Sequence, residues 1–147
     1  MKFSLRALIL IAILFALSLS ACAPDTKPED ENKPVTLEPI DGTDLNRLTL
    51  SEKAAERLGL EIATVQTQQI DGAERLVVPY AALLYDPSGG AWVYVNVSPL
   101  VFVREAISVD FIEGDAVVLF EGPKAGSSVV TMGATELFGS ESEFEEE

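Results

Sequence analysis

A single cysteine, Cys22, is the feature that most limits what this chain can become. With no second thiol, no internal disulfide can form. Cys22 also follows an apolar run, Ala7 to Leu19, that begins behind Lys2 and Arg6. This run of about 13 residues fits the core of a secretory signal and is shorter than the roughly 20 residues needed to span a bilayer. Residues 1–21 are therefore predicted to be a signal peptide that is removed.

The residues that lead into the cysteine are Leu19-Ser20-Ala21-Cys22, which resemble the lipobox of bacterial lipoprotein precursors. The resemblance implies that the Cys22 thiol receives a diacylglycerol and that its new amino group receives a third acyl chain. Three chains would hold the protein on a membrane, because each buried CH2 contributes about 0.8 kcal/mol. The alternative is an ordinary signal peptide cleaved elsewhere, with Cys22 left as a free thiol. The position of the lone cysteine favours lipidation, and predicts an envelope protein that faces the periplasm or the cell exterior.

The charge of the chain argues against nucleic acid as a partner. There are 24 acidic and 10 basic residues and no histidine, for a net charge of −14, which becomes −16 when Lys2 and Arg6 leave with the signal peptide. Nucleic-acid phosphates and anionic lipid headgroups would both repel such a protein, so acyl chains must make the membrane contact. Without histidine or a second cysteine, the commonest general base and the soft metal ligands are missing. We therefore expect no enzyme activity, no cofactor and no metal.

Composition divides the remaining chain into three parts. Residues 22–44 hold four prolines and few sizeable apolar side chains, which predicts a flexible linker behind the lipidated cysteine. Residues 45–138 carry nearly all the β-branched and aromatic side chains and form the predicted folded domain. Residues 139–147 contain five glutamates, which predicts an acidic, disordered tail. This tail could gather cations loosely, but a solubilising role is the simpler interpretation.

Local patterns within residues 45–138 predict an all-β domain with one short helix. Ser51 is a suitable N-cap for a helix through Leu58, and Gly59 suits its left-handed end. Asp71-Gly72 is a tight-turn signal. Short β-rich runs separated by Gly, Pro and Asp favour a small β-barrel or roll. These runs are Leu60 to Val65, Leu76 to Val78, Ala91 to Val97, Leu100 to Val109, Ala116 to Phe120 and Ser128 to Met132.

Four aromatic residues invite a ligand interpretation. Tyr80, Tyr85, Trp92 and Tyr94 could line a groove and use their polar tips as hydrogen-bonding groups. On a strand, however, Trp92 and Tyr94 would share one side and a row of valines would occupy the other. Both sides of that strand would then be covered, which favours a core or interface role.

A cluster of carboxylates is the other candidate site. Asp110, Glu113 and Asp115 could offer oxygen ligands to a hard cation, but their spacing matches no calcium loop, and Gly114 favours a turn between strands. No catalytic set can be assembled either, because serines occur without histidine and Lys124 lies in a Gly-Pro-rich turn where solvation keeps it protonated. Binding therefore remains as the expected activity.

Five motifs follow one another in the second half of the chain. They are Val78-Pro79-Tyr80-Ala81-Ala82-Leu83-Leu84, Ala91-Trp92-Val93-Tyr94-Val95, Val103-Arg104-Glu105-Ala106-Ile107-Ser108-Val109, Glu113-Gly114-Asp115, and residues 122–134. Their order resembles the membrane-proximal domain of periplasmic adaptor subunits, the HlyD-like membrane fusion proteins of resistance-nodulation-division efflux pumps. Upstream, residues 48–60 are similar to the segment that opens the same domain in heavy-metal-type adaptors.

The resemblance implies a small β domain that contacts a transporter. In such adaptors a β-barrel, a lipoyl-like domain and usually a helical hairpin are inserted within this domain, whereas this chain has only Asp71 to Arg75 between Ile70 and Leu76. We therefore expect a reduced or accessory adaptor that binds a transporter or a full-length adaptor. The alternative is a free-standing lipoprotein that carries a small ligand or metal to a pump. The sequence predicts no oligomeric state and is compatible with an anchor in either membrane.

Overall fold

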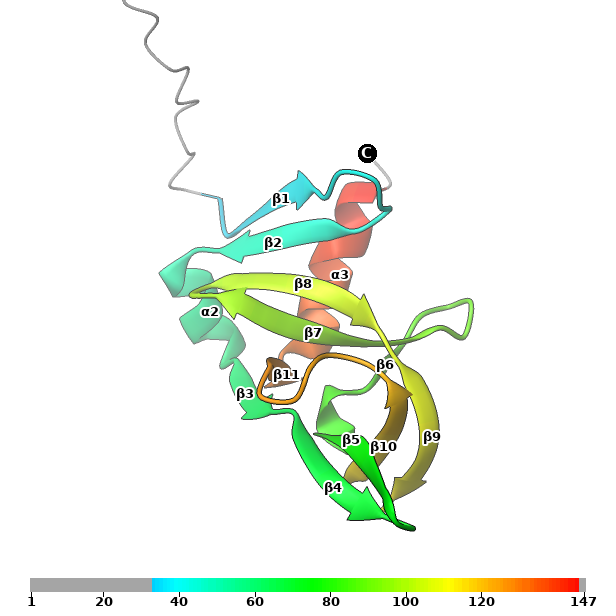
Figure 1. Ribbon diagram of the computed structural model, residues 1–147. Coiled ribbons are helices and arrows are strands. Elements are labelled where there is room, and N and C mark those ends of the chain that lie inside the picture. The colour runs from blue at the N-terminus through cyan, green and yellow to red at the C-terminus, as the bar shows by residue number, and fades with distance from the viewer. Residues whose placement is uncertain (1–32, 146–147) are drawn as a thin grey trace, which may run out of the picture. The chain divides into compact units, whose positions relative to one another are not determined.

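The computed structural model describes residues 33–145, with side chains through Ser142. The predicted signal peptide and Cys22 lie outside the described residues. The described part is a mostly β domain with two α-helices (Figure 1), which confirms the predicted fold class. Neither helix is long and apolar enough to cross a membrane.

The elements follow one another along the chain with short connections. The strands are β1 (Val35–Pro39), β2 (Asn46–Leu50), β3 (Glu61–Thr64), β4 (Gln66–Ile70), β5 (Ala73–Pro79), β6 (Leu84–Tyr85), β7 (Ala91–Ser98), β8 (Val101–Ala106), β9 (Ser108–Glu113), β10 (Ala116–Glu121) and β11 (Ser128–Met132). The helices are α2 (Glu52–Leu58), the 3-10 helix η1 (Tyr80–Ala82) and α3 (Ala134–Glu145).

Two open antiparallel sheets make up the domain. The seven-stranded sheet has the order β1-β2-β8-β7-β11-β3, with β6 paired to β7, and the four-stranded sheet has the order β4-β5-β10-β9. The chain passes from the seven-stranded to the four-stranded sheet at Val65 and again at Ile107, and both side chains are buried. The run from Leu100 to Val109, predicted as one strand, is thus two strands in different sheets. The sheets stay open and do not close into a barrel.

The predicted helix and the predicted hairpin turn are both confirmed. The Ser51 hydroxyl accepts a hydrogen bond from the backbone N–H of Ala54 at 3.2 Å, and Gly59 ends α2 with φ of 59°. Asp71 and Gly72 have φ of 51° and 78°, so both residues of the β4–β5 turn are left-handed, as in the two-residue turns that suit hairpins. The turn joins β4 to β5, and every residue of β4 pairs with β5.

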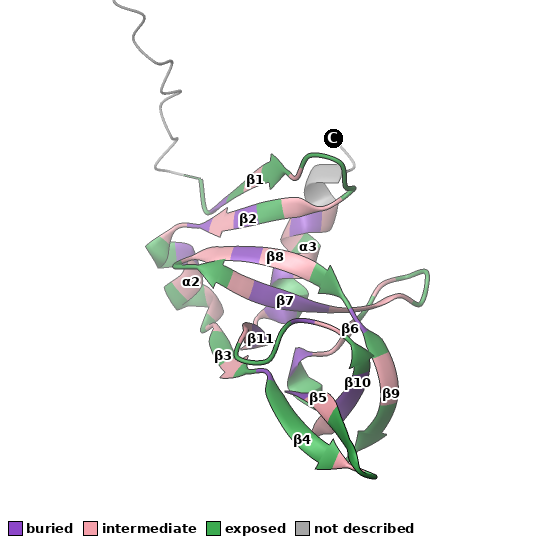
Figure 2. Ribbon diagram, in the orientation of Figure 1, coloured by how far each residue is buried: buried purple, intermediate pink, exposed green. Residues whose placement is uncertain are grey.

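Strand β7 separates two apolar cores. The Tyr94 side chain enters a cluster that also contains Leu48, Phe102 and Leu137, and this cluster lies between the seven-stranded sheet and the two α-helices. Val93 and Val95 point the other way, into a second cluster shared with the four-stranded sheet. Figure 2 shows the buried residues along β7 and β10. Tyr94 alternates with Val93 and Val95, as expected from the sequence, and β7 therefore contributes side chains to both cores.

Strand β1 lies inside the region predicted to be a linker, so the boundary at residue 45 is wrong. Val35 is buried and Leu37 packs against the first core, while β1 pairs with β2 from Val35↔Leu50 to Pro39↔Asn46. Two of the four prolines that suggested a linker, Pro34 and Pro39, fall at the ends of the strand, where a missing N–H costs little. An average over 22–44 concealed the alternation between them.

Helix α3 replaces much of the tail that was predicted to be disordered from Gly139. It runs to Glu145 and packs against β1, β2 and β11. Leu137 and Glu141, one helical turn apart, are completely buried. Acidic composition predicted solvation for these residues, but the fold supplies buried partners for one of the carboxylates, as described below.

Candidate functional site

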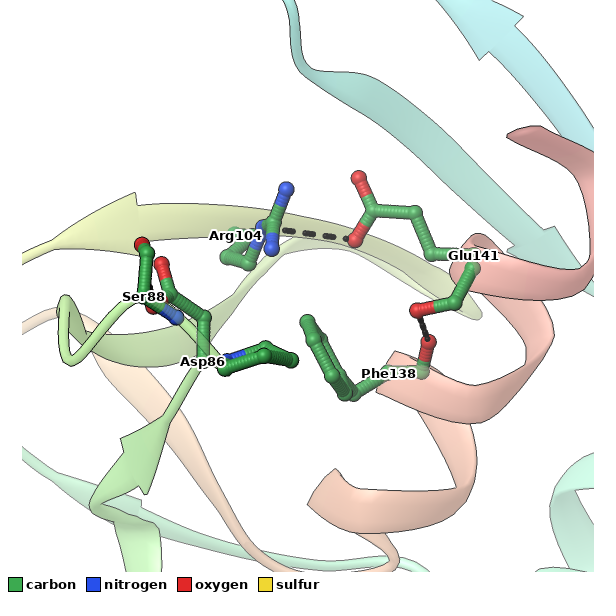
Figure 3. Close-up of a pocket in the computed structure, with 7 residues that line it drawn as sticks. Asp86, Ser88, Arg104, Phe138 and Glu141 are labelled. Carbon is green, nitrogen blue, oxygen red and sulfur yellow. Dashed lines mark hydrogen bonds and ion pairs between the residues drawn. The ribbon is translucent and has the colours of Figure 1, made fainter. Parts of the chain in front are cut away.

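A pocket of about 320 Å³ lies between α3 and the loop that joins β6 to β7 (Figure 3). Its lining residues are Asp86, Pro87 and Ser88 from the loop, Arg104 from β8, and Phe138, Glu141 and Ser142 from α3. This volume is near the lower limit of small-ligand sites, which measure about 300–1,000 Å³. The chemistry of the lining side chains decides what the pocket can do.

The carboxylate of Asp86 organises the loop on one side of the pocket. Its Oδ1 accepts hydrogen bonds from the Ser88 hydroxyl at 2.7 Å and from the backbone N–H groups of Ser88 and Gly90 at 2.8 Å, and its Oδ2 accepts one from the Trp92 indole at 2.8 Å. These donors, led by the Ser88 hydroxyl and Trp92, hold the pKa of Asp86 well below its ordinary value. A Cβ at Gly90 would lie 2.6 Å from Oδ2, so the carboxylate needs glycine there.

The guanidinium of Arg104 forms the centre of the pocket. It lies 4.6 Å from the centre of the Trp92 ring and 5.3 Å from that of Phe138, both within reach of cation–π attraction. Its Nε is 3.5 Å from Oε2 of Glu141, which makes an ion pair across from β8 to α3. The Arg104 side chain is only 12% exposed. Arg104 therefore connects the sheet, the loop and the helix.

Glu141 is the buried charge that fastens α3 to the sheet. Its side chain is 1% exposed, and Oε2 accepts a hydrogen bond of 2.6 Å from the Tyr94 hydroxyl in addition to the Arg104 ion pair. Among the described residues, Glu141 Oε1 and Arg104 Nε have no hydrogen-bond partner. A buried ion pair adds little to stability by itself, but removal of one partner leaves an uncompensated charge and is strongly destabilising. The three side chains therefore fix the position of α3.

The pocket offers little for catalysis. The Ser88 hydroxyl donates a hydrogen bond to Asp86, and the chain has no histidine that could act as a base. The charged groups are engaged with one another or with the loop. This arrangement suits attachment of α3 better than chemistry on a substrate.

The four candidate aromatic residues do not come together in one groove. Tyr94 is fully buried in the first core, which confirms its predicted core role. Trp92 is partly buried beside the pocket and bonded to Asp86. Tyr80 and Tyr85 are 52% and 58% exposed on η1 and β6. Only Trp92 contributes to the surroundings of the pocket.

The acidic candidates lie at and near a hairpin turn, as predicted. Gly114 has φ of 57° in the turn between β9 and β10. Asp110 faces Arg75 across the sheet, with 3.7 Å between a carboxylate oxygen and a guanidinium nitrogen. Within the described part of the chain, no group of three His, Cys, Asp or Glu side chains is placed to hold a metal ion.

A second candidate surface is one face of the four-stranded sheet, which we call the Phe120 face. It carries Arg75, Val77, Phe111, Val118 and Phe120. Register places Val118 opposite both Val77 and Phe111, and the guanidinium of Arg75 lies 4.9 Å from the Phe120 ring. The opposite face of these strands contributes to the second core. The Phe120 face is thus the side of the sheet that the two cores do not use.

Sequence reasoning missed both Glu141 and the Phe120 face. The spacing of Leu137 and Glu141 by four residues was a helical signal, but the surrounding glutamates outweighed it. For the sheet, the signal was the run from Val117 to Phe120, which is apolar at every position and so predicts a strand with apolar side chains on both faces. Only one of those faces enters a core.

Comparisons with known proteins give one structural likeness to report. No family model matches the chain, and no curated protein does either. A solved structure that resembles it is the NMR structure of a 180-residue piece of SilB from Cupriavidus metallidurans CH34, which encompasses the N-terminal metal-binding site and the membrane proximal domain of that protein. The TM-score is 0.45 at 22% identity, over 69% of this chain and 66% of that one. The likeness concerns the fold alone.

Proposed function

We propose that the protein is a lipid-anchored envelope protein that acts as a reduced or accessory adaptor. Its β domain would bind a transporter or a full-length adaptor of an efflux or export system. The order of five motifs along the chain supports this proposal, because those motifs contribute to β5, η1, β6, β7, β8, β9, β11 and the turns between strands in one two-sheet domain. The acyl chains on Cys22 would hold the domain at its membrane.

The short β4–β5 hairpin is the main reason to propose that the protein is a reduced adaptor. In the adaptors that the sequence resembles, additional domains are inserted at this point. Here Asp71 and Gly72 alone connect the two strands, which pair continuously from Gln66↔Val77 to Ile70↔Ala73. A domain without the helical hairpin would not bridge to an outer channel, so it would act beside another protein that does.

The pocket beside Arg104 favours a second candidate function, the binding of a small ligand for delivery to a pump. Its volume of about 320 Å³ is sufficient for a small molecule. Against this, its charged groups already pair with one another, and a ligand would have to compete with those contacts. We therefore give the adaptor role precedence.

Crosslinking in native membranes tests the proposed function. The full chain should trap a transporter or adaptor subunit, and calorimetry with divalent transition metals should show no tight site. Cys22→Ser, whose hydroxyl cannot form the thioether, should release the protein from the membrane fraction and block maturation. A variant that stayed membrane-bound after a carbonate wash, with its signal cleaved, would place the anchor elsewhere. Micromolar metal binding together with no crosslinked envelope partner would favour the ligand-carrier function instead.

A further inference from the structure

Two valines on the Phe120 face are buried without belonging to either core. Val77 is 6% exposed and Val118 is 2% exposed, yet neither is part of the two clusters that hold the domain together. The aromatic side chains on the same face are open to solvent, with 37% exposure for Phe111 and 56% for Phe120. The face therefore has a dry centre beside two exposed rings, which is the composition of the centre of a protein interface.

A hollow of about 210 Å³ adjoins this centre. Val77, Pro79 and Ala116 are among its walls, and the acidic Asp115 also lines it. Side chains of apolar residues gain most when they enter such a recess, because water leaves both surfaces. The hollow would accept one apolar side chain of a partner.

Some charged side chains on this face have an ion-pair partner and others do not. Arg75 is held over the Phe120 ring and pairs with Asp110, so the only cation we assign to the face is already neutralised by a neighbour. Glu113 pairs in register with Ala116 and so lies on the same face, and it is exposed, as is Asp115. Among the residues that the structure describes, neither carboxylate takes part in an ion pair. Two such charges at the edge of an apolar centre call for positive charge on the partner.

We propose that the Phe120 face binds a protein surface in which an apolar side chain is flanked by lysine or arginine. This inference rests on the proposed function, since it specifies where the domain meets its envelope partner and what that partner presents. A second copy of the chain is a poorer occupant, because each copy carries a net charge of −14, or −16 without residues 1–21, and its Phe120 face offers no cation other than Arg75, which pairs with Asp110. An anionic membrane surface is repelled for the same reason.

Site-specific photocrosslinking in native membranes tests the proposal on the full chain. A benzophenone amino acid replaces Phe111 or Phe120 in one set of variants, and Tyr85 or Val97, which are exposed on the seven-stranded sheet, in the control set. Mass spectrometry identifies the trapped protein and the residue that was attacked. Adducts should form from the Phe120 face, at apolar positions next to lysine or arginine of a single envelope protein, and should be at least about tenfold weaker from the control positions.

A charge-matched pair of double variants tests the electrostatic part. Glu113→Gln with Asp115→Asn removes the carboxylate that lines the hollow and the one in register with Ala116. Glu52→Gln with Glu56→Gln removes two exposed carboxylates from α2. The first pair should lower the crosslinking yield from Phe120 about tenfold, a change that corresponds to about 1.4 kcal/mol, and added salt should lower it further. The second pair should leave the yield unchanged. Equal losses from both pairs would show a response to net charge only and would overturn the assigned surface.

The other outcomes separate this inference from the proposed function. Adducts to an envelope protein from Tyr85 or Val97 alone would refute the surface and leave the proposed function standing. Adducts at twice the mass of the chain, or adducts to lipid, would assign the face to a second copy or to the membrane and would refute the inference. No adduct from any position would refute both. Circular dichroism of each variant checks that the domain is folded.

Discussion

Helix α3 covers one face of the seven-stranded sheet, whereas no helix among residues 33–145 covers the Phe120 face of the four-stranded sheet (Figure 1). Both sheets have strands with apolar side chains on each face. On the covered side, Tyr94 and Arg104 offer a hydroxyl and a guanidinium to Glu141, so an acidic helix can be buried there. On the other side, Arg75 is satisfied by Asp110 within the sheet itself. Whether a helix covers a sheet face thus depends on polar groups that can pair with that helix as well as on apolar area.

The largest effect on stability is expected when β1 and the end of α3 are removed from the seven-stranded sheet. Residues 45–138, the domain predicted from composition, lack β1 and the part of α3 that carries Glu141. We expect this fragment to unfold at a markedly lower temperature than residues 33–147, or to lose cooperative unfolding, because the stability of a small domain is only about 5–15 kcal/mol. Thermal unfolding followed by circular dichroism measures the difference. Equal melting temperatures would mean that β1 and α3 add no stability to the sheet. The contrast between the covered sheet and the uncovered Phe120 face would then not concern stability.

Removal of the buried carboxylate should have the next largest effect. Glu141→Ala leaves Arg104 buried without its ion pair and should lower the free energy of unfolding by about 3–5 kcal/mol. Glu141→Gln keeps a hydrogen-bond acceptor for Tyr94 and should cost less. Chemical denaturation gives both values, and Glu136→Ala, an exposed site on the same helix, is the control. A loss no greater than that of the control would show that α3 is held by its apolar residues alone.

Acid should weaken the covered side through Asp86. Its pKa is lowered in the folded state, so the stability it contributes is complete above its ordinary value of 3.8 and is lost as the pH falls toward the lowered value. Asp86→Asn should therefore reduce the slope of unfolding free energy against pH below about pH 4. An unchanged slope in denaturation curves measured across that range would show that the hydrogen bonds of this loop do not matter for folding.

Glu105, on β8, provides a control for that pH series, because its pKa is shifted in the opposite direction from that of Asp86. Partial burial raises its pKa, and Lys124 opposes the shift. A carboxyl group with a raised pKa contributes stability below its ordinary value of 4.5 and loses that contribution as the pH rises through the raised value. Glu105→Gln should thus leave the domain as stable or slightly more stable at neutral pH, and a clear loss of stability there would contradict the assigned direction.

The smallest effect on stability is expected for a substitution on the Phe120 face. Phe120→Ser removes an aromatic ring that is 56% exposed and lies outside both cores, so the free energy of unfolding should change by no more than about 0.5 kcal/mol. Leu137→Ala, a buried change on the covered side, should cost about 2–5 kcal/mol. A large loss from Phe120→Ser would show that this ring and Arg75 belong to a third core and not to a free surface.

Local features of the fold could be predicted from the sequence because they depend on neighbouring residues. The cap at Ser51, the left-handed end at Gly59 and the turn at Asp71-Gly72 each satisfy or bend a backbone within a few positions of themselves. The alternation of Tyr94 with Val93 and Val95 predicted a strand covered on both sides, and the structure confirms it. Cys22 and its lipid remain a prediction from the sequence.

Tertiary structure decided the rest, because the deciding partners are far apart in the chain. Glu141 is 47 positions from Tyr94, and the acidic segment alone does not indicate that the Tyr94 hydroxyl will bind its carboxylate. Val35 and Leu37 form a strand only because β2 offers an edge to pair with. The division of residues 100–109 at Ile107 likewise depends on which sheet each half can join. Composition averages over such segments, whereas burial depends on the particular groups that meet a side chain in three dimensions.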